Sequence, residues 1–189
     1  MHDRGFRARP VPVRDWQPEL PAGTLQSVIL HWTAGDYATV FPAYHFCLSG
    51  ASNVLVHATH DLRANMRDLR TDAAGPYAAH TQGRNSFAAG LAVCAMRSAT
   101  PSDFGFYPLH TEQVAALCAV AATLVRFYGI ALDAVRTHAE AALEDGYFGA
   151  ESDDVRWDIA RLEPSKAALQ RSEAHAVGDE LRRRIAVLG

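Results

Sequence analysis

The 189-residue sequence has only three cysteines, a single lysine and no apolar run of the length that a membrane span requires. Cys47, Cys94 and Cys118 are odd in number and widely spaced, which argues against a disulfide framework and against a Cys-x-x-Cys metal site. A membrane span needs about 18 or more consecutive apolar residues, so we expect no stable membrane insertion. Residues 1–16 lack the apolar segment of a secretory signal peptide, which predicts a protein that is cytoplasmic as synthesised.

The sequence also lacks an excess of positive charge. Its 18 Lys+Arg residues stand against 21 Asp+Glu residues, for a formal net charge of -3. This balance argues against a nucleic-acid partner and against a polybasic membrane-surface protein, because neither would have its phosphate-attracting field. The composition, 49% hydrophobic and 21% charged, is that of a globular protein, and the length suffices for one ordinary domain. We expect a monomer.

Apolar patterns and turn residues predict a chain of strands and helices. The segments that read as short β-strands are 24–30, 43–49, 53–57, 88–96 and 134–137, the second and third forming a hairpin. The clearest helix covers 111–128, with Thr111 expected as its N-cap and Gly129 as its left-handed C-terminal cap. A polar helix is predicted between 164 and 188, interrupted in propensity by Gly178.

Two histidines stand where loops commonly build functional sites, at the ends of predicted strands. His31 follows the first strand and His138 follows the last one, and Asp158 comes later in the chain. Two imidazoles and one carboxylate leave the fourth position of tetrahedral zinc open for water, as catalytic sites require. Zinc lowers the pKa of such a water to about 7. From the residues alone, this triad is one hypothesis among several.

Several segments of the chain carry a more specific pattern. They are VILHWTA (28–34), AYHF (43–46), AAHTQGRNSFAAGLAV (78–93) and VRTHAE (135–140), followed by RWD (156–158). In this order they resemble the zinc-dependent N-acetylmuramoyl-L-alanine amidases of type 2, which include small phage lysins and share a fold with peptidoglycan recognition proteins. The resemblance covers about residues 24–162. It implies an α/β fold with a mixed central β-sheet flanked by α-helices.

The resemblance also implies residue roles. His31, His138 and Asp158 match the zinc (Zn2+) ligands of the family. Tyr44 matches a tyrosine that assists proton transfer or binds the tetrahedral intermediate in the phage-lysin branch, and Arg156 stands where catalytic members have an oxyanion-stabilising lysine. The residues assigned to the substrate groove are His80, Thr81, Asn85 and Trp32.

The third ligand has alternatives. The interval between His138 and Asp158 is longer than is usual in the family, so Asp145, Asp153 or Asp154 are other candidates. The order of cation and ligand in RWD favours Asp158.

The general base has alternatives too. The predicted strand 88–96 carries no glutamate, unlike the branch that recycles muropeptides, so the base is Tyr44, Glu140 or the metal-bound water acting with solvent. Glu140 is also a candidate to orient a ligand imidazole, or else it caps a helix or faces solvent.

These assignments predict hydrolysis of the amide between the lactyl group and L-alanine in peptidoglycan by a phage- or prophage-type lysin, which acts on the cell wall once released. The alternatives are a non-catalytic peptidoglycan-binding module and a cytoplasmic anhydromuropeptide-recycling amidase. The predicted organisation is an N-terminal arm (1–23), loosely packed, an amidase domain (24–162) and a C-terminal helical extension (163–189). We expect the extension to pack on the domain, and the alternative is contact with membrane or wall through Arg182 to Arg184.

Overall fold

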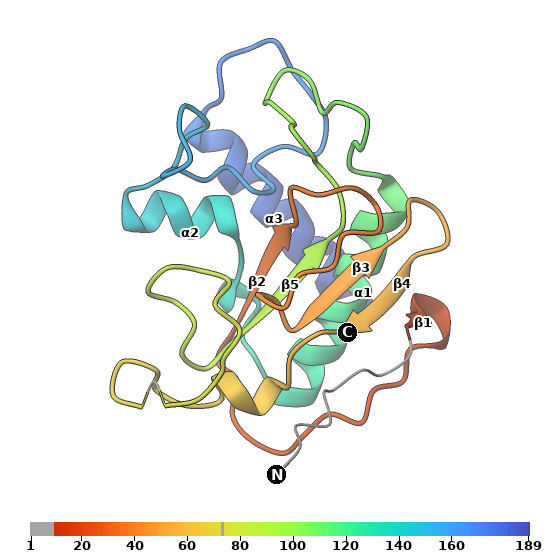
Figure 1. Ribbon diagram of the computed structural model, residues 1–189, viewed down its shortest axis with the longest axis vertical. Helices are drawn as coiled ribbons and strands as arrows, with labels where there is room; N and C mark the ends of the chain where they lie inside the picture. Colours follow the sequence, from red (N-terminus) through yellow and green to blue (C-terminus); the bar gives the residue numbers. More distant parts are fainter. Residues whose placement is uncertain (1–9, 73) are drawn as a thin grey trace.

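The computed structural model describes residues 10–72 and 74–189, which form a six-stranded sheet with helices and loops on its faces (Figure 1). The strands, in sheet order, are β1 (Val11–Pro12), β4 (Leu55–Ala58), β3 (Phe46–Ser49), β5 (Ala88–Val93), β2 (Ser27–Trp32) and β6 (Val135–Thr137). The α-helices are α1 (Thr111–Tyr128), α2 (His138–Asp145) and α3 (Arg171–Leu188), and the short 3-10 helices are η1 (Val13–Asp15), η2 (Leu62–Asn65) and η3 (Leu132–Ala134). The predicted α/β class is confirmed.

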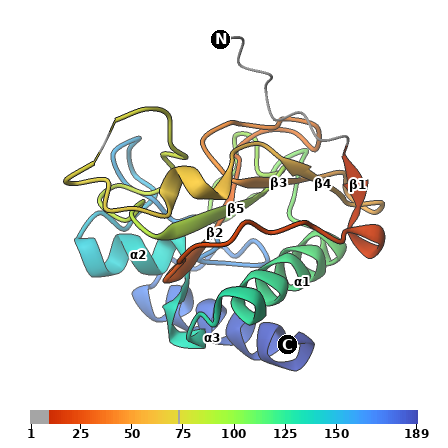
Figure 2. The same ribbon diagram turned by 90° about the horizontal axis from the view of Figure 1, so that it is seen from below.

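The sheet is mixed. Strands β3, β5, β2 and β6 run parallel, whereas at one edge β4 pairs antiparallel with β3, and β1 pairs antiparallel with β4. All of β5 is buried, and in β2 only Ser27 is partly exposed. Strands buried in this way belong to parallel sheets that are covered on both faces. Figure 2 shows α1 and α3 together on one face, with loops and η2 on the other.

Side-chain alternation along β2 separates the core from the site. Val28, Leu30 and Trp32 belong to the apolar cluster that includes α1, so His31 points to the opposite face of the sheet. The parallel register sets Leu30 beside Thr137 of β6. The next residue along each strand is a histidine, His31 on β2 and His138 at the start of α2. The fold therefore brings these two histidines to the same end of adjacent strands.

The helix predicted over 111–128 is confirmed at both ends, and Gly129 has a φ of 65° as its left-handed cap. The expected cap residue was wrong: His110 is the N-cap, because the Gln113 side chain accepts a hydrogen bond from the His110 amide at 3.2 Å. Thr111 is the first helical residue. The first strand is displaced toward the C-terminus, so His31 lies within it and not after it.

The C-terminal helix is packed against the rest of the fold. It begins at Arg171, later than predicted, and its Leu181 and Ile185 belong to the same core cluster as α1. Gly178 does not interrupt the helix. The carboxylate of Glu140 from α2 lies against Gly178, and a Cβ there would collide with it. The glycine thus permits a close approach between α2 and α3.

The predicted N-terminal arm is packed more closely than expected. Residues 1–9 lie outside the described part of the chain, but Val11 and Pro12 pair with β4, and the Trp16 ring meets Phe46 edge-on at 5.4 Å. The Tyr128 hydroxyl of α1 donates to the Pro21 carbonyl at 2.9 Å. In the described residues, none of the helices has both the length and the apolar character of a membrane span.

Candidate functional site

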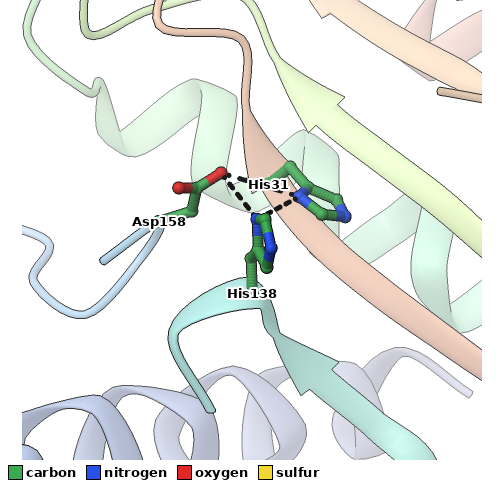
Figure 3. A group of neighbouring side chains, drawn as sticks. All are labelled: His31, His138 and Asp158. Carbon is green, nitrogen blue, oxygen red and sulfur yellow. Dashed lines mark hydrogen bonds and ion pairs between the residues drawn. The ribbon is translucent and has the colours of Figure 1, made fainter. Parts of the chain in front are cut away.

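Three buried side chains converge at the C-terminal end of β2 (Figure 3). The Nδ1 atoms of His31 and His138 are 3.1 Å apart, and Oδ2 of Asp158 lies 3.2 Å from His138 Nδ1 and 3.6 Å from His31 Nδ1. Asp158 comes from the loop before α3, and its carbonyl accepts a hydrogen bond from the Ala139 amide at 3.0 Å. That bond ties the loop to the first turn of α2. The three residues form a group that fits a metal ion.

Burial and mutual contact set the charges of this group. Burial lowers the pKa of His31 to about 4, so its imidazole is neutral at pH 7 and offers a lone pair. Burial by itself would raise the pKa of Asp158, but the hydrogen bond from His138, followed by the contact with His31, holds that pKa below its usual range. An ionised carboxylate beside a neutral imidazole is the protonation state that a divalent cation requires of its ligands.

The alternative third ligands do not join this group. Both carboxylate oxygens of Asp145 accept hydrogen bonds from Arg84, at 2.6 and 2.7 Å. Asp153 and Asp154 are exposed on the loop that follows α2. The structure therefore brings Asp158, and none of these three, to the two histidines.

His138 and Asp158 line a cavity of about 700 Å³, as do Tyr44 and Arg156, whereas His31 is fully buried and is not part of the lining. The Tyr44 ring stands 5.0 Å from the His31 ring, and its hydroxyl donates to the Trp32 carbonyl at 3.4 Å. Burial, followed by the negative charge of Asp158, raises the pKa of Tyr44 above its usual range. The phenol is therefore protonated at neutral pH and is a hydrogen-bond donor inside the cavity.

Arg156 lines the same cavity but turns its guanidinium to its own loop. It donates to the carbonyls of Asp153 and Val155. Its side chain is exposed and has no carboxylate partner in the described residues. Arg156 therefore lies at the predicted site, but its hydrogen-bond donors are directed to backbone carbonyls.

The predicted groove residues lie deeper than expected. Thr81 and His80 are 2% and 6% exposed, and Asn85 accepts hydrogen bonds from the amides of both, at 2.9 and 3.1 Å. Thr81 Oγ1 lies 3.3 Å from His31 Nε2, so this loop contacts the ring nitrogen of His31 that is not directed to Asp158. Only His80 of this loop trio reaches the cavity lining. Trp32 also lines it, but the residue is 5% exposed and packs edge-on against Trp157, with ring centroids 4.6 Å apart.

Glu140 requires a correction, because the structure does not place it as a base, as a partner of a ligand imidazole or at the surface. The residue is 2% exposed. Its carboxylate accepts hydrogen bonds from Arg182 of α3 at 2.8 and 3.0 Å and from the Thr137 amide at 2.9 Å. The last bond belongs to a capping box, so the predicted capping role is confirmed. The carboxylate is committed to joining α2 to α3.

Two aromatic residues at the site were not predicted. Tyr147 follows α2 and its ring stands 5.9 Å from the His138 ring, with a buried hydroxyl that has no partner among the described residues. Burial raises the pKa of Tyr147 to about 12. Trp157, between Arg156 and Asp158, lines the cavity. In the sequence, these two aromatic residues are marked only by their nearness to His138 and Asp158. Nearness along the chain does not distinguish a site residue from a residue that packs in the core.

A buried His-His-Asp group beside an open cavity, at the end of parallel strands, is an arrangement that could hold a metal ion for hydrolysis. A comparison with protein families matches residues 21–154 to the N-acetylmuramoyl-L-alanine amidase family. The chain belongs to that family and is an amidase that acts on peptidoglycan. The match ends before Asp158, so the assignment of this residue rests on geometry. A search of curated proteins found no match to this chain.

Proposed function

We propose that the chain is a zinc-dependent lysin of the phage type, which hydrolyses the amide between the lactyl group and L-alanine of peptidoglycan. The observation that carries the proposal is the convergence of His31, His138 and Asp158. Zinc bonds of about 2.0–2.1 Å set tetrahedral ligand atoms about 3.3 Å apart. The separations here are 3.1, 3.2 and 3.6 Å, and two nitrogens with one oxygen suit zinc.

When bound, zinc would polarise the scissile carbonyl and lower the pKa of a water. The chain's own residues supply the rest. The protonated Tyr44 hydroxyl exchanges its long bond to the Trp32 carbonyl for the substrate oxygen on which negative charge develops. Arg156 turns from its loop carbonyls into the cavity and places a positive charge near the same oxygen. Trp157, which lines the cavity and is partly exposed, contacts the peptide beside these groups.

The lysin type is supported by what surrounds the ligands. Tyr44 lies against His31, as the phage-lysin resemblance implies, and β5 carries no carboxylate where the recycling branch has its base. The complete ligand group counts against a module that only binds peptidoglycan.

The test is to measure bound zinc by atomic spectroscopy and the release of stem peptides from purified peptidoglycan by mass spectrometry. We expect about one zinc per chain, loss of release after chelation and recovery when zinc is returned. Zinc-loaded protein that sediments with peptidoglycan yet releases no stem peptide would refute hydrolysis and leave binding as the function.

Arg156→Ala should lower kcat at least tenfold with little change in KM, because one donor to a developing oxyanion contributes about 10²–10³ in rate at well-organised sites. Arg156→Lys should retain most of the activity, since a compact cation serves the same oxygen. Arg183→Ala is the control, as Arg183 is 73% exposed and pairs with Glu180 on α3. Steady-state kinetics on a soluble muramyl peptide measures all three. An unchanged kcat in Arg156→Ala would remove this residue from the mechanism.

A further inference from the structure

We propose that Thr81 and His80 form a hydrogen-bonded relay that fixes the tautomer and orientation of His31 for metal binding, in place of the substrate-groove role that the sequence predicts. The inference rests on the proposed metal site. It assigns Thr81 as a positioning residue, which acts through His31 and does not touch the substrate.

The two ring nitrogens of His31 face different partners. Its Nδ1 is directed to His138 and Asp158, and its Nε2 lies 3.3 Å from Thr81 Oγ1. The Thr81 oxygen lies in turn 2.9 Å from His80 Nδ1. All members of this chain are buried, with His31 fully inaccessible to solvent. Water therefore does not compete for these bonds, and each side chain depends on its neighbour.

If His31 binds a metal through Nδ1, only one placement of the protons on His31, Thr81 and His80 satisfies these hydrogen bonds. A neutral imidazole that offers the Nδ1 lone pair carries its proton on Nε2, so His31 donates to the Thr81 oxygen. The Thr81 hydroxyl then directs its own proton to His80 Nδ1, which acts as the acceptor. His80 consequently carries its proton on Nε2. The hydroxyl is the group that links the two rings, since it both accepts and donates.

Asn85 and Gly90 hold the side chains of the relay in place. Asn85 Oδ1 accepts hydrogen bonds from the amides of His80 and Thr81 and thereby fixes the loop that carries both side chains. The His80 ring lies directly on Gly90 of β5, where a Cβ would collide with the ring. Gly90 pairs with Ile29 of β2, so the His80 ring packs against β5, the strand next to β2.

His80 is a poor choice for stability alone. Its Nε2 is buried and has no hydrogen-bond partner in the described residues, and an unsatisfied buried polar group destabilises the fold. An apolar side chain of similar shape would avoid that cost. The requirement for an acceptor beside Thr81 explains why an imidazole occupies this position.

The test compares Thr81→Val, which removes the hydroxyl at nearly constant volume, with Thr81→Ser, which keeps it. Zinc affinity is measured by competition with a chromophoric chelator, and the His31 tautomer by 15N NMR of the metal-free protein. Loss of a partner that orients a metal ligand typically costs 10–100-fold in affinity. We expect that loss in Thr81→Val, together with a mixture of His31 tautomers, and near wild-type values in Thr81→Ser.

Thermal unfolding of each variant controls for misfolding, and the tautomer measurement is made on folded protein. Wild-type zinc affinity in Thr81→Val with an unchanged His31 tautomer would overturn the relay while leaving the amidase proposal intact. Conversely, wild-type protein that binds zinc without cleaving peptidoglycan would refute the proposed function and leave the relay standing. A tautomer change in Thr81→Val would support the relay even if wild-type protein bound no zinc.

Discussion

Asp158→Ala should bind zinc far more weakly than the wild type and lower kcat/KM at least a hundredfold. Metal polarisation supplies several kcal/mol of transition-state stabilisation, and each 1.36 kcal/mol is a factor of ten in rate. The variant also leaves only two imidazoles, one fewer protein ligand than catalytic zinc sites have. Because Asp158 accepts a hydrogen bond from His138, the change further frees that ring to turn. Bound zinc and peptide release are measured on the same preparation.

The matched controls are Asp153→Ala and Asp154→Ala. Both residues are exposed carboxylates on the loop that leads to Asp158, and both were alternative ligands by spacing alone. They should retain wild-type zinc content and at least half of the activity. If Asp158→Ala kept a full equivalent of zinc while one of these variants lost it, the third ligand would be assigned to the wrong residue.

The sequence predicted the part of the site that parallel strands determine. His31 and His138 stand at the ends of apolar segments, and adjacent parallel strands present such ends at one edge. This local pattern suggested the two histidines, and the resemblance to the amidase family then singled them out as ligands. Asp158 was harder to assign, because a loop with several carboxylates separates it from His138. The deciding fact is a tertiary contact between its backbone and Ala139, which spacing along the chain does not show.

Glu140 and Thr81 show why local reasoning fails elsewhere. Glu140 follows a ligand histidine by two positions, which suggested chemistry, but its partner Arg182 lies 42 positions away on α3. Thr81 belongs to a motif that suggested a groove, yet its hydroxyl meets His31, 50 positions away. In both residues the role is set by a partner that is distant in sequence. Polar side chains have such roles more often than apolar ones, whose burial alone is predicted by periodicity.

The same contacts show that α3 is part of the domain core. Arg182 donates to Glu140 and to the Val135 carbonyl, Arg183 and Arg184 both pair with Glu180, and Leu181 and Ile185 are 1% exposed. The predicted basic patch is thus neutralised by partners on α2 and α3. In the described residues, the extension therefore packs on the domain.

Truncation after Leu162 should therefore abolish the cooperative fold. Removing a buried Leu or Ile side chain costs about 2–5 kcal/mol, and α3 contributes Leu181 and Ile185 to the core. Loss of Arg182 leaves Glu140 buried without its cationic partner, at about 3–5 kcal/mol. Together these losses are comparable with the whole stability of a typical domain, about 5–15 kcal/mol. Circular dichroism during heating should show no sharp transition for residues 1–162.

A second truncation after Ala186 tests whether the loss comes from these contacts. It removes Val187 and Leu188, which are 87% and 50% exposed, and the terminal Gly189. It keeps Leu181, Ile185 and the pair between Arg182 and Glu140, so its melting temperature should lie within a few degrees of that of the full chain. A cooperative transition in residues 1–162 near the full-length temperature would show that α3 is dispensable for folding. The helix would then be available for contacts outside the domain, and activity on whole cells would be the measurement to compare between the two truncations.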